Sequence, residues 1–280
     1  MAIGVAAILT AGATGCVILE SKERELVYRP VREYVRTPAD LALAYDDLWI
    51  DVPVSAGTTE RVHAWWLPAA DANAPAILYL HGIRWSLGNN LHRIARWREL
   101  GFSVLAIDYR GFGRSDGELP AEAHIYADAR AAWAELGRRV PHAERRFIYG
   151  HSLGAAVALD LAAGVDDAAG VIAEAGFTSL ADVVAESNLP LSWLVTERFD
   201  ALAKARTLKL PVLFLHGTAD RLVPPSMSER LYEAAPQPKR LHWIEGAGHG
   251  NRGGVGLPAY RSAVLGFVAA AQSHAVARAP

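Results

Sequence analysis

Two hydrophobic patterns divide the chain, and the first covers residues 48–67. Apolar and polar side chains alternate in two runs there, Leu48 to Val54 and Glu60 to Leu67, with Ser55-Ala56-Gly57-Thr58 between them. Alternation with a period of two is typical of strands that bury one face. Two such runs joined by a short, glycine-containing link predict an antiparallel hairpin.

The second pattern consists of short, continuous apolar runs, which are typical of strands buried on both faces. These runs are Ala76–Leu80, Phe102–Ile107, Arg146–Tyr149, Gly170–Ala173, Pro211–Leu215 and Leu241–Ile244, and segments of helical length lie between them at about 88–100, 120–139, 153–163, 180–207 in pieces, 226–235 and 257–272. Strands that alternate with helices after an antiparallel opening predict an α/β fold, with a mostly parallel central sheet and helices on both faces. Ligands bind beyond the carboxyl ends of the strands in such sheets, so the chemistry is expected there.

The organisation expected along the chain has three parts: residues 1–19, an approach segment at 20–47 and the main α/β domain at 48–273. We expect the approach segment to be irregular, because Pro30 and Pro38 would interrupt a long helix.

The first part, residues 1–19, is the one compositional break. Ala2 to Leu19 carries no charge, and the chain then turns abruptly polar. One interpretation is a secretory segment that ends at a lipoprotein box, Ala13-Thr14-Gly15-Cys16, with Cys16 as the lipidated residue. Small residues before the cleavage point favour this, and the lack of Lys or Arg near Met1 argues against it unless the chain starts upstream.

Two other interpretations of residues 1–19 remain open. About 18 apolar residues just suffice for an uncleaved membrane anchor, and Lys22, Arg24 and Arg29 would then keep the following chain on the cytoplasmic side. An ordinary buried helix with an incidental cysteine is the third. We expect membrane association through the N-terminus at the cell envelope, by lipidation rather than by an uncleaved anchor.

Charge and composition exclude several classes of function. The formal net charge is -2, and no block of like charge suggests a nucleic-acid partner. The single cysteine cannot form an internal disulfide framework, and the ten histidines lack the cysteine partners of a zinc site. We therefore expect neither a metal nor another cofactor.

The clearest candidate for chemistry is Gly150-His151-Ser152-Leu153-Gly154, which follows a predicted strand and opens a predicted helix. This is the context of a G-x-S-x-G nucleophile elbow, whose tight turn exposes the serine hydroxyl in a strained backbone state. Free N–H groups at the helix N-terminus also point toward a developing anion. The bare pattern occurs in simple glycine-rich turns too, but this position favours a nucleophile.

A serine nucleophile needs a base and an acid that orients the base, in the order serine, acid, histidine for this kind of sheet. Asp220 follows one apolar strand and His249 lies in the glycine-flanked loop after the last strand. Both positions fall at strand carboxyl ends, on the same rim as Ser152. The weaker rivals are Asp182 and Asp200 for the acid and His242 and His274 for the base.

The oxyanion formed by serine attack needs two backbone N–H donors. Leu153, directly after the nucleophile, supplies one. The loop after the first central strand, Leu80-His81-Gly82-Ile83-Arg84-Trp85, should supply the other from Ile83, because Gly82 allows a close approach of the backbone.

From about Tyr28 to Phe267 the chain resembles α/β-hydrolases of the serine aminopeptidase-like branch, small bacterial enzymes with almost no cap domain. The motifs that carry the resemblance are Leu80-His81-Gly82, Asp108-Tyr109-Arg110-Gly111-Phe112-Gly113-Arg114-Ser115, the Ser152 elbow, Leu215-His216-Gly217-Thr218-Ala219-Asp220 and Gly246-Ala247-Gly248-His249. The resemblance implies a serine hydrolase, and since relatives include thioesterases and lipid esterases, it implies no proteolysis. The chain departs from the family at Ile83, where relatives often have asparagine.

The expected function is hydrolysis of a carboxylic ester or thioester through an acyl-enzyme on Ser152, with a small acyl compound, which can be lipid-like, as substrate. About 35 residues separate the strand near Glu174 from Pro211, too few for a cap domain, so we expect a shallow pocket under an apolar flap around Trp193. Trp85 and Trp193 are candidate substrate contacts, and Trp65 and Trp66 could extend an acyl groove, although any single tryptophan more often packs in the core or against a strand. Peptide or amide hydrolysis and a catalytically silent binding scaffold are the alternatives.

Overall fold

The computed structural model describes residues 21–55, 57–186, 195–251 and 254–278. The interpretations of residues 1–19 with Cys16, and of the flap with Trp193, therefore lie outside the described residues.

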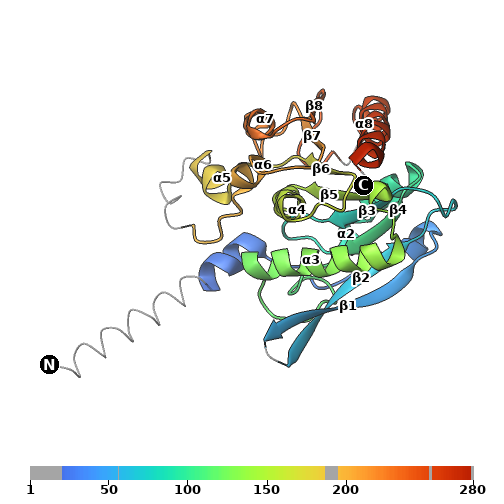
Figure 1. The fold of residues 1–280 in the computed structure, drawn as a ribbon. Coiled ribbons are helices and arrows are strands. Elements are labelled where there is room, and N and C mark those ends of the chain that lie inside the picture. The colour runs from blue at the N-terminus through green and yellow to red at the C-terminus, as the bar shows by residue number, and fades with distance from the viewer. Residues whose placement is uncertain (1–20, 56, 187–194, 252–253, 279–280) are drawn as a thin grey trace, which may run out of the picture.

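Among the described residues, eight strands form one mixed sheet in the order β1-β2-β4-β3-β5-β6-β7-β8 (Figure 1). The strands are β1 (Asp46–Ser55), β2 (Thr58–Leu67), β3 (Ala76–Leu80), β4 (Ser103–Ile107), β5 (Arg146–His151), β6 (Gly170–Glu174), β7 (Val212–Gly217) and β8 (Lys239–Ile244). β1 pairs with β2 and β2 with β4 in antiparallel fashion, and all other pairs are parallel. The predicted fold class, a mostly parallel sheet with antiparallel N-terminal strands, is confirmed.

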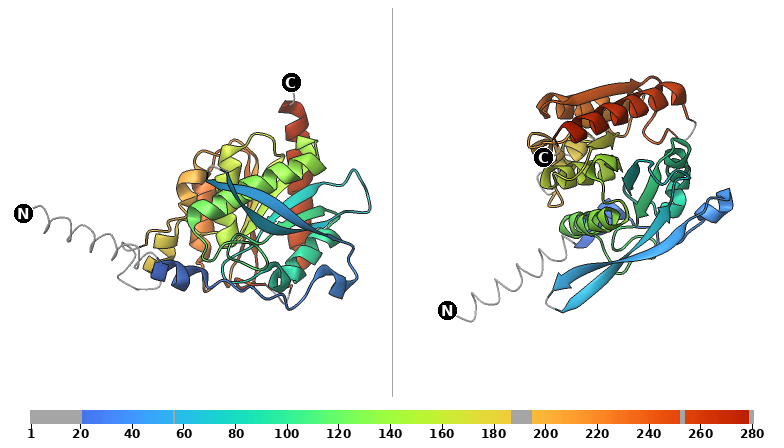
Figure 2. Two further views of the ribbon diagram at one scale, coloured as in Figure 1. Left: turned by 90° about the horizontal axis from the view of Figure 1, so that it is seen from below. Right: turned by 45° about the vertical axis from the view of Figure 1, so that its right-hand side comes forward.

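Helices pack on both faces of this sheet (Figures 1 and 2). They are η1 (Pro38–Leu41), α2 (Leu87–Glu99), α3 (Glu122–Arg139), η2 (Ala143–Arg145), α4 (Leu153–Gly164), α5 (Leu180–Glu186), α6 (Ala201–Ala205), α7 (Pro225–Ala234) and α8 (Leu257–Arg278). The buried side chains of α3, α4, α6 and α7 belong to one core, and those of α2 and α8 to the other. None of the helices in the described part of the chain combines the length and the apolar character needed to cross a bilayer.

The alternation of side chains along the central strands explains why two cores form. In β3, Leu78 and Leu80 face the α3/α4 side, whereas Ile77 and Tyr79 face the α2/α8 side. Successive strand residues point to opposite faces, so a strand covered by helices on both sides is apolar along most of its length. This is why continuous apolar runs marked β3 to β7.

The approach segment is more ordered than expected, because residues 21–28 are helical. The Arg24 guanidinium lies 2.9 Å from a Glu197 carboxylate oxygen, and the Tyr28 hydroxyl donates to the other oxygen of Glu197. Figure 1 shows this short blue helix beside the beginning of α3. The helix ends before Pro30, as the proline predicts. The expectation of an irregular segment was wrong here because contacts distant in sequence stabilise the helix.

The register of the parallel strands determines where the functional loops lie. Gly150 of β5 pairs with Leu80 of β3, and Gly217 of β7 pairs with Ile244 of β8. The strands therefore end along one edge of the sheet. The loops after β3, β5, β7 and β8 all begin there, as expected for a ligand site in such a sheet.

Candidate active site

Ser152 stands in the turn between β5 and α4 with φ 57° and ψ -119°. A non-glycine residue in this region carries about 1–3 kcal/mol of strain, which persists only where the surroundings impose it. A Cβ atom on Gly150 would lie 1.8 Å from the Gly154 carbonyl oxygen. A Cβ atom on Gly154 would lie 2.1 Å from the Leu80 carbonyl oxygen. Both glycines of the motif are thus required by close packing of the turn.

The structure brings Ser152, His249 and Asp220 together. His249 Nε2 lies 3.0 Å from Ser152 Oγ, and His249 Nδ1 lies 2.7 Å from Asp220 Oδ2. The loops that carry Asp220 and His249 touch at Gly217, where an added side chain would meet the Ala247 carbonyl oxygen at 2.2 Å. Ser152 and His249 are 97 positions apart along the chain, and the fold brings them within hydrogen-bond distance.

Asp220 is buried but well supplied with hydrogen-bond donors. Its Oδ1 accepts from the amides of Leu222 and Val223 at 2.9 and 3.0 Å, and His216 Nε2 lies 3.2 Å from Oδ2. Burial raises the pKa of Asp220, but hydrogen bonds from His216 and His249 lower it more, so the net pKa is below its ordinary value. Asp220 is therefore a carboxylate at neutral pH and can accept a hydrogen bond from the protonated Nδ1 of His249.

The rival residues lie in other settings. Asp200 accepts from the Ala203 amide at 3.0 Å and so caps α6, and Asp182 accepts from the Thr178 hydroxyl. His242 lies within β8 and His274 within α8, and neither lines the cavity around Ser152.

The loop after β3 lies directly against the nucleophile. A side chain on Gly82 would sit 3.3 Å from Ser152 Cβ, which shows how closely this backbone approaches. Among the described residues, the amides of Ile83 and Leu153 have no backbone acceptor. They are therefore available to an oxygen that enters the cavity.

The approach segment helps to shape this loop. Arg84 has φ 78°, and its carbonyl oxygen accepts from the Val31 amide at 2.9 Å. The Ser86 hydroxyl donates to the carbonyl oxygen of Glu33 at 3.2 Å. Residues 31–33 thus fix the loop that follows Ile83. The sequence did not predict this contact.

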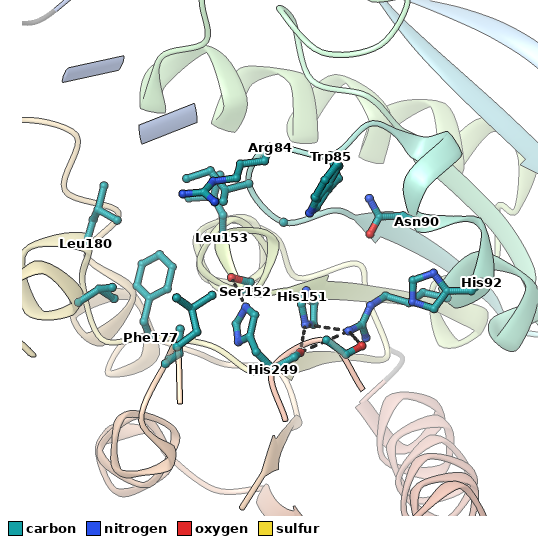
Figure 3. A pocket seen from close by; sticks show the side chains of 17 residues that line it. Arg84, Trp85, Asn90, His92, His151, Ser152, Leu153, Phe177, Leu180 and His249 are labelled. Atoms are coloured by element: carbon teal, nitrogen blue, oxygen red, sulfur yellow. Dashed lines mark hydrogen bonds between the residues drawn. The ribbon is translucent and has the colours of Figure 1, made fainter. Parts of the chain in front are cut away.

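A cavity of about 270 Å³ surrounds Ser152 (Figure 3). Phe177 and Leu180 lie on one side of the serine, and Trp85, Asn90 and His92 lie on the other. Val183, Leu222 and Val223 also line the cavity, and we call these three, together with Phe177 and Leu180, its apolar arm.

The tryptophan predictions met different outcomes. Trp85 lines the cavity, as proposed. Trp65 is fully buried in the α2/α8 core, and Trp66 packs under the guanidinium of Arg139, so neither extends the groove. The groove interpretation is therefore wrong for these two, and the alternative of core and strand packing is confirmed, with Trp65 and Trp66 on opposite faces of β2. The apolar arm was missed, since its residues carry no motif and come from separate loops.

A buried ionic network also lies at this site, and sequence analysis missed it. The Arg93 guanidinium, on α2, lies 2.7 Å from a carboxylate oxygen of Glu174, at the end of β6. Burial raises the pKa of Glu174, but Arg93 and then His151 lower it more, to about 2. Burial, followed by the charges of Arg93 and His249, lowers the pKa of His151 well below its ordinary value, so His151 is neutral.

No group of three or more His, Cys, Asp or Glu side chains placed to hold a metal ion occurs within the described ranges.

Comparisons with known proteins agree with this fold. The family model described as "Serine aminopeptidase, S33" matches residues 71–200 and 194–251, which include Ser152, Asp220 and His249. An uncharacterized protein of Mycobacterium tuberculosis is 34% identical over 253 residues, which cover 89% of this chain and 88% of that protein. The protein belongs to the serine aminopeptidase S33 family. It is therefore an α/β hydrolase.

Further relatives extend the likeness across kingdoms. The α/β-hydrolase domain-containing protein WAV2 of Arabidopsis thaliana is 32% identical over 251 residues, with 79% of this chain and 78% of that protein covered. A solved structure of an esterase from Pyrococcus furiosus has the same fold, with a TM-score of 0.71 and 24% identity over 86% of this chain and 98% of that one.

Proposed function

We propose that this hydrolase is a serine acyl hydrolase that cleaves a carboxylic ester or thioester. The observation that carries the proposal is the chain of contacts from Ser152 Oγ to His249 Nε2 at 3.0 Å and from His249 Nδ1 to Asp220 Oδ2 at 2.7 Å. A hydroxyl is a weak nucleophile at its own pKa and needs an adjacent base that a third group orients. Ser152 is the nucleophile, His249 the general base and Asp220 the orienting acid.

In the first half-reaction, Ser152 Oγ bonds to the substrate carbonyl carbon while its proton passes to His249 Nε2. The carbonyl electron pair moves onto oxygen, and the amides of Ile83 and Leu153 donate to this oxyanion. When the intermediate collapses, the bond to the alcohol or thiol breaks and the leaving group takes the proton from His249. Water then repeats the sequence on the acyl-enzyme, releases the acid and restores the serine hydroxyl.

The cavity supports an apolar acyl group. The arm formed by Phe177, Leu180, Val183, Leu222 and Val223 offers apolar surface to the cavity, with Phe177 and Leu180 on one side of Ser152, whereas Asn90 and His92 add polar groups beside Trp85 on the other. The P. furiosus protein of similar fold is named an esterase, which is consistent with this chemistry. We place the acyl chain in the arm and the alcohol or thiol on the polar side.

A panel of esters with graded acyl length tests this placement. Each methylene buried in the arm contributes about 0.8 kcal/mol, so kcat/KM should rise about fourfold per methylene until the arm is full. Val183→Trp fills the arm, and we expect it to lower kcat/KM for longer esters at least tenfold while acetate esters change little. Val276→Trp, on the exposed side of α8, is the matched control.

Two results of the ester panel would contradict the proposal. Identical chain-length profiles in the wild type and in Val183→Trp would remove the acyl chain from the arm. Faster cleavage of an amide than of the matched ester would favour peptide or amide hydrolysis.

We also propose that the enzyme is held at the membrane of the cell envelope through its N-terminus, with lipid attached to Cys16. Ala13-Thr14-Gly15 before the single cysteine supports this, and the proposed chemistry has no use for a thiol. One acyl chain alone gives marginal binding, so firm attachment would need a diacylglycerol together with a further chain. The described chain begins at residue 21 with a helix that packs against Glu197.

Fractionation of a bacterial host tests the anchor. The wild type should sediment with membranes, and Cys16→Ser should block lipid incorporation and processing. Removal of residues 1–19 should give soluble enzyme that still cleaves short esters. A Cys16→Ser protein that stays in the membrane at unchanged mass would instead indicate an uncleaved anchor. A soluble wild type would contradict both the lipid anchor and the uncleaved anchor.

A further inference from the structure

A buried ion pair lies beneath the loop that carries His249. Arg93 and Glu174 are each 3% exposed, and Arg93 Nη1 lies 2.7 Å from Glu174 Oε1. The hydroxyls of Tyr149 and Tyr260 donate to Glu174 Oε2 at 2.8 and 3.0 Å. The carboxylate is thus fixed from β5 and α8, and it fixes the guanidinium in turn.

The other end of the guanidinium contacts the His249 loop. Arg93 Nη2 donates to the Gly250 carbonyl oxygen at 2.5 Å and lies 3.5 Å from that of His249. His151 Nε2 lies 3.0 Å from Arg93 Nη2 and 2.9 Å from the His249 carbonyl oxygen, and the tautomer of His151 decides which of these two is a hydrogen bond. The network therefore contacts the backbone carbonyl oxygens of both His249 and Gly250.

Within the described residues, other hydrogen bonds also hold this loop, from the Gly246 amide to the Thr218 hydroxyl, from the Ala219 amide to the Ala247 carbonyl oxygen and from the Asn251 amide to the Gly248 carbonyl oxygen, but none of them reaches the 249 and 250 carbonyl oxygens. The loop contains Gly246, Gly248 and Gly250 around His249, and glycine leaves the backbone more freedom than any other residue. Its 249 and 250 carbonyls lie beyond the end of β8, outside the ladder of the sheet. The imidazole must nevertheless stay within hydrogen-bond reach of Ser152, since a displacement of 1 Å can lower a rate about 10²-fold.

The stability of the fold alone does not explain why Arg93 and Glu174 are buried as an ion pair. Desolvation of two charges offsets most of their attraction, so well-packed apolar residues of similar volume often stabilise as much or more. A planar guanidinium does, however, present several donors in a fixed fork, and it can bind a carboxylate on one side and carbonyls on the other.

We propose that Arg93 is a positioning residue for His249: its guanidinium, fixed by Glu174, binds the 249–250 backbone and so holds the imidazole at Ser152. The proposal rests on the proposed function, because it assigns Arg93 a task in that reaction. Arg93 does not touch the reacting atoms and acts through His249.

Kinetics of Arg93 variants test the proposal. Arg93→Met should lower kcat about 10²-fold and leave KM within about threefold, because the substrate arm is intact and only the base is displaced. Arg93→Lys should recover part of the loss, since one ammonium cannot bind Glu174 and the loop carbonyls in the same geometry.

A second buried pair in the protein provides the matched control. Arg110 is also 3% exposed, and its Nε lies 2.6 Å from Oδ1 of the buried Asp128. Arg110→Met breaks an equally buried pair that does not contact the His249 loop. We expect it to lower the thermal transition about as much as Arg93→Met while kcat of the folded protein stays within about threefold.

Proton NMR reports on the loop without substrate. The Nδ1 proton of His249, hydrogen-bonded to Asp220, should give a downfield signal in the wild type and in Arg110→Met. Arg93→Met should broaden or lose it. If Arg93→Met keeps both this signal and kcat, or if Arg110→Met loses as much kcat, the positioning role is refuted. A wild type without Ser152-dependent hydrolysis would overturn the proposed function, whereas the signal would still show whether Arg93 holds the loop.

Discussion

Replacement of Ser152 by alanine is expected to lower ester turnover about 10⁵–10⁶-fold, to near the background rate. The change removes the atom that forms the acyl-enzyme, and loss of a nucleophile from a working triad costs about this much. The thermal transition should hardly move, because alanine keeps the backbone of the turn and only one hydroxyl is lost. Turnover of a short ester and a melting curve measure the two effects.

Ser273→Ala is the matched control for this experiment, because Ser273 is an exposed serine on α8. Its turnover should equal that of the wild type. Ester turnover by Ser152→Ala within tenfold of the wild type would show that another group carries the chemistry.

Asp220→Asn is expected to lower kcat about 10⁴-fold. The carboxylate accepts from His249 Nδ1 at 2.7 Å, so it keeps the hydrogen on Nδ1 and the lone pair on Nε2, which faces Ser152. An asparagine amide can donate to Nδ1 instead, and the wrong tautomer then leaves no base at the serine. Steady-state kinetics with a short ester give the ratio.

Asp200→Asn separates the assigned acid from its rival. Asp200 caps α6, and asparagine is as good a cap as aspartate, so both stability and kcat should stay close to the wild type. If Asp200→Asn loses more activity than Asp220→Asn, the acid has been placed in the wrong loop.

The sequence predicted those features of the fold that depend on local pattern. Continuous apolar runs marked β3 to β7 within two residues of their bounds, because strands buried on both faces are apolar along most of their length, with polar residues such as Arg146 and Glu174 near their ends. Chain order and strand context selected Ser152, Asp220 and His249, and the structure brings these three within hydrogen-bond distance.

Features that depend on contacts between distant segments were not predictable in this way. Arg93 and Glu174 are 81 positions apart, and neither belongs to a motif. The helix at residues 21–28 is stabilised by Glu197, about 170 positions away. The sequence left Trp65 open between a ligand groove and the core, and its place on β2 directs it into the core.

The most direct test of the proposed nucleophile is the site at which a fluorophosphonate attaches. The serine oxygen displaces fluoride and bonds to phosphorus, so the intact protein gains the mass of one phosphonyl group. We predict one adduct per chain, on the peptide that contains Ser152, and no adduct in Ser152→Ala. An adduct on any other residue, or equal labelling of the wild type and Ser152→Ala, would contradict the assignment.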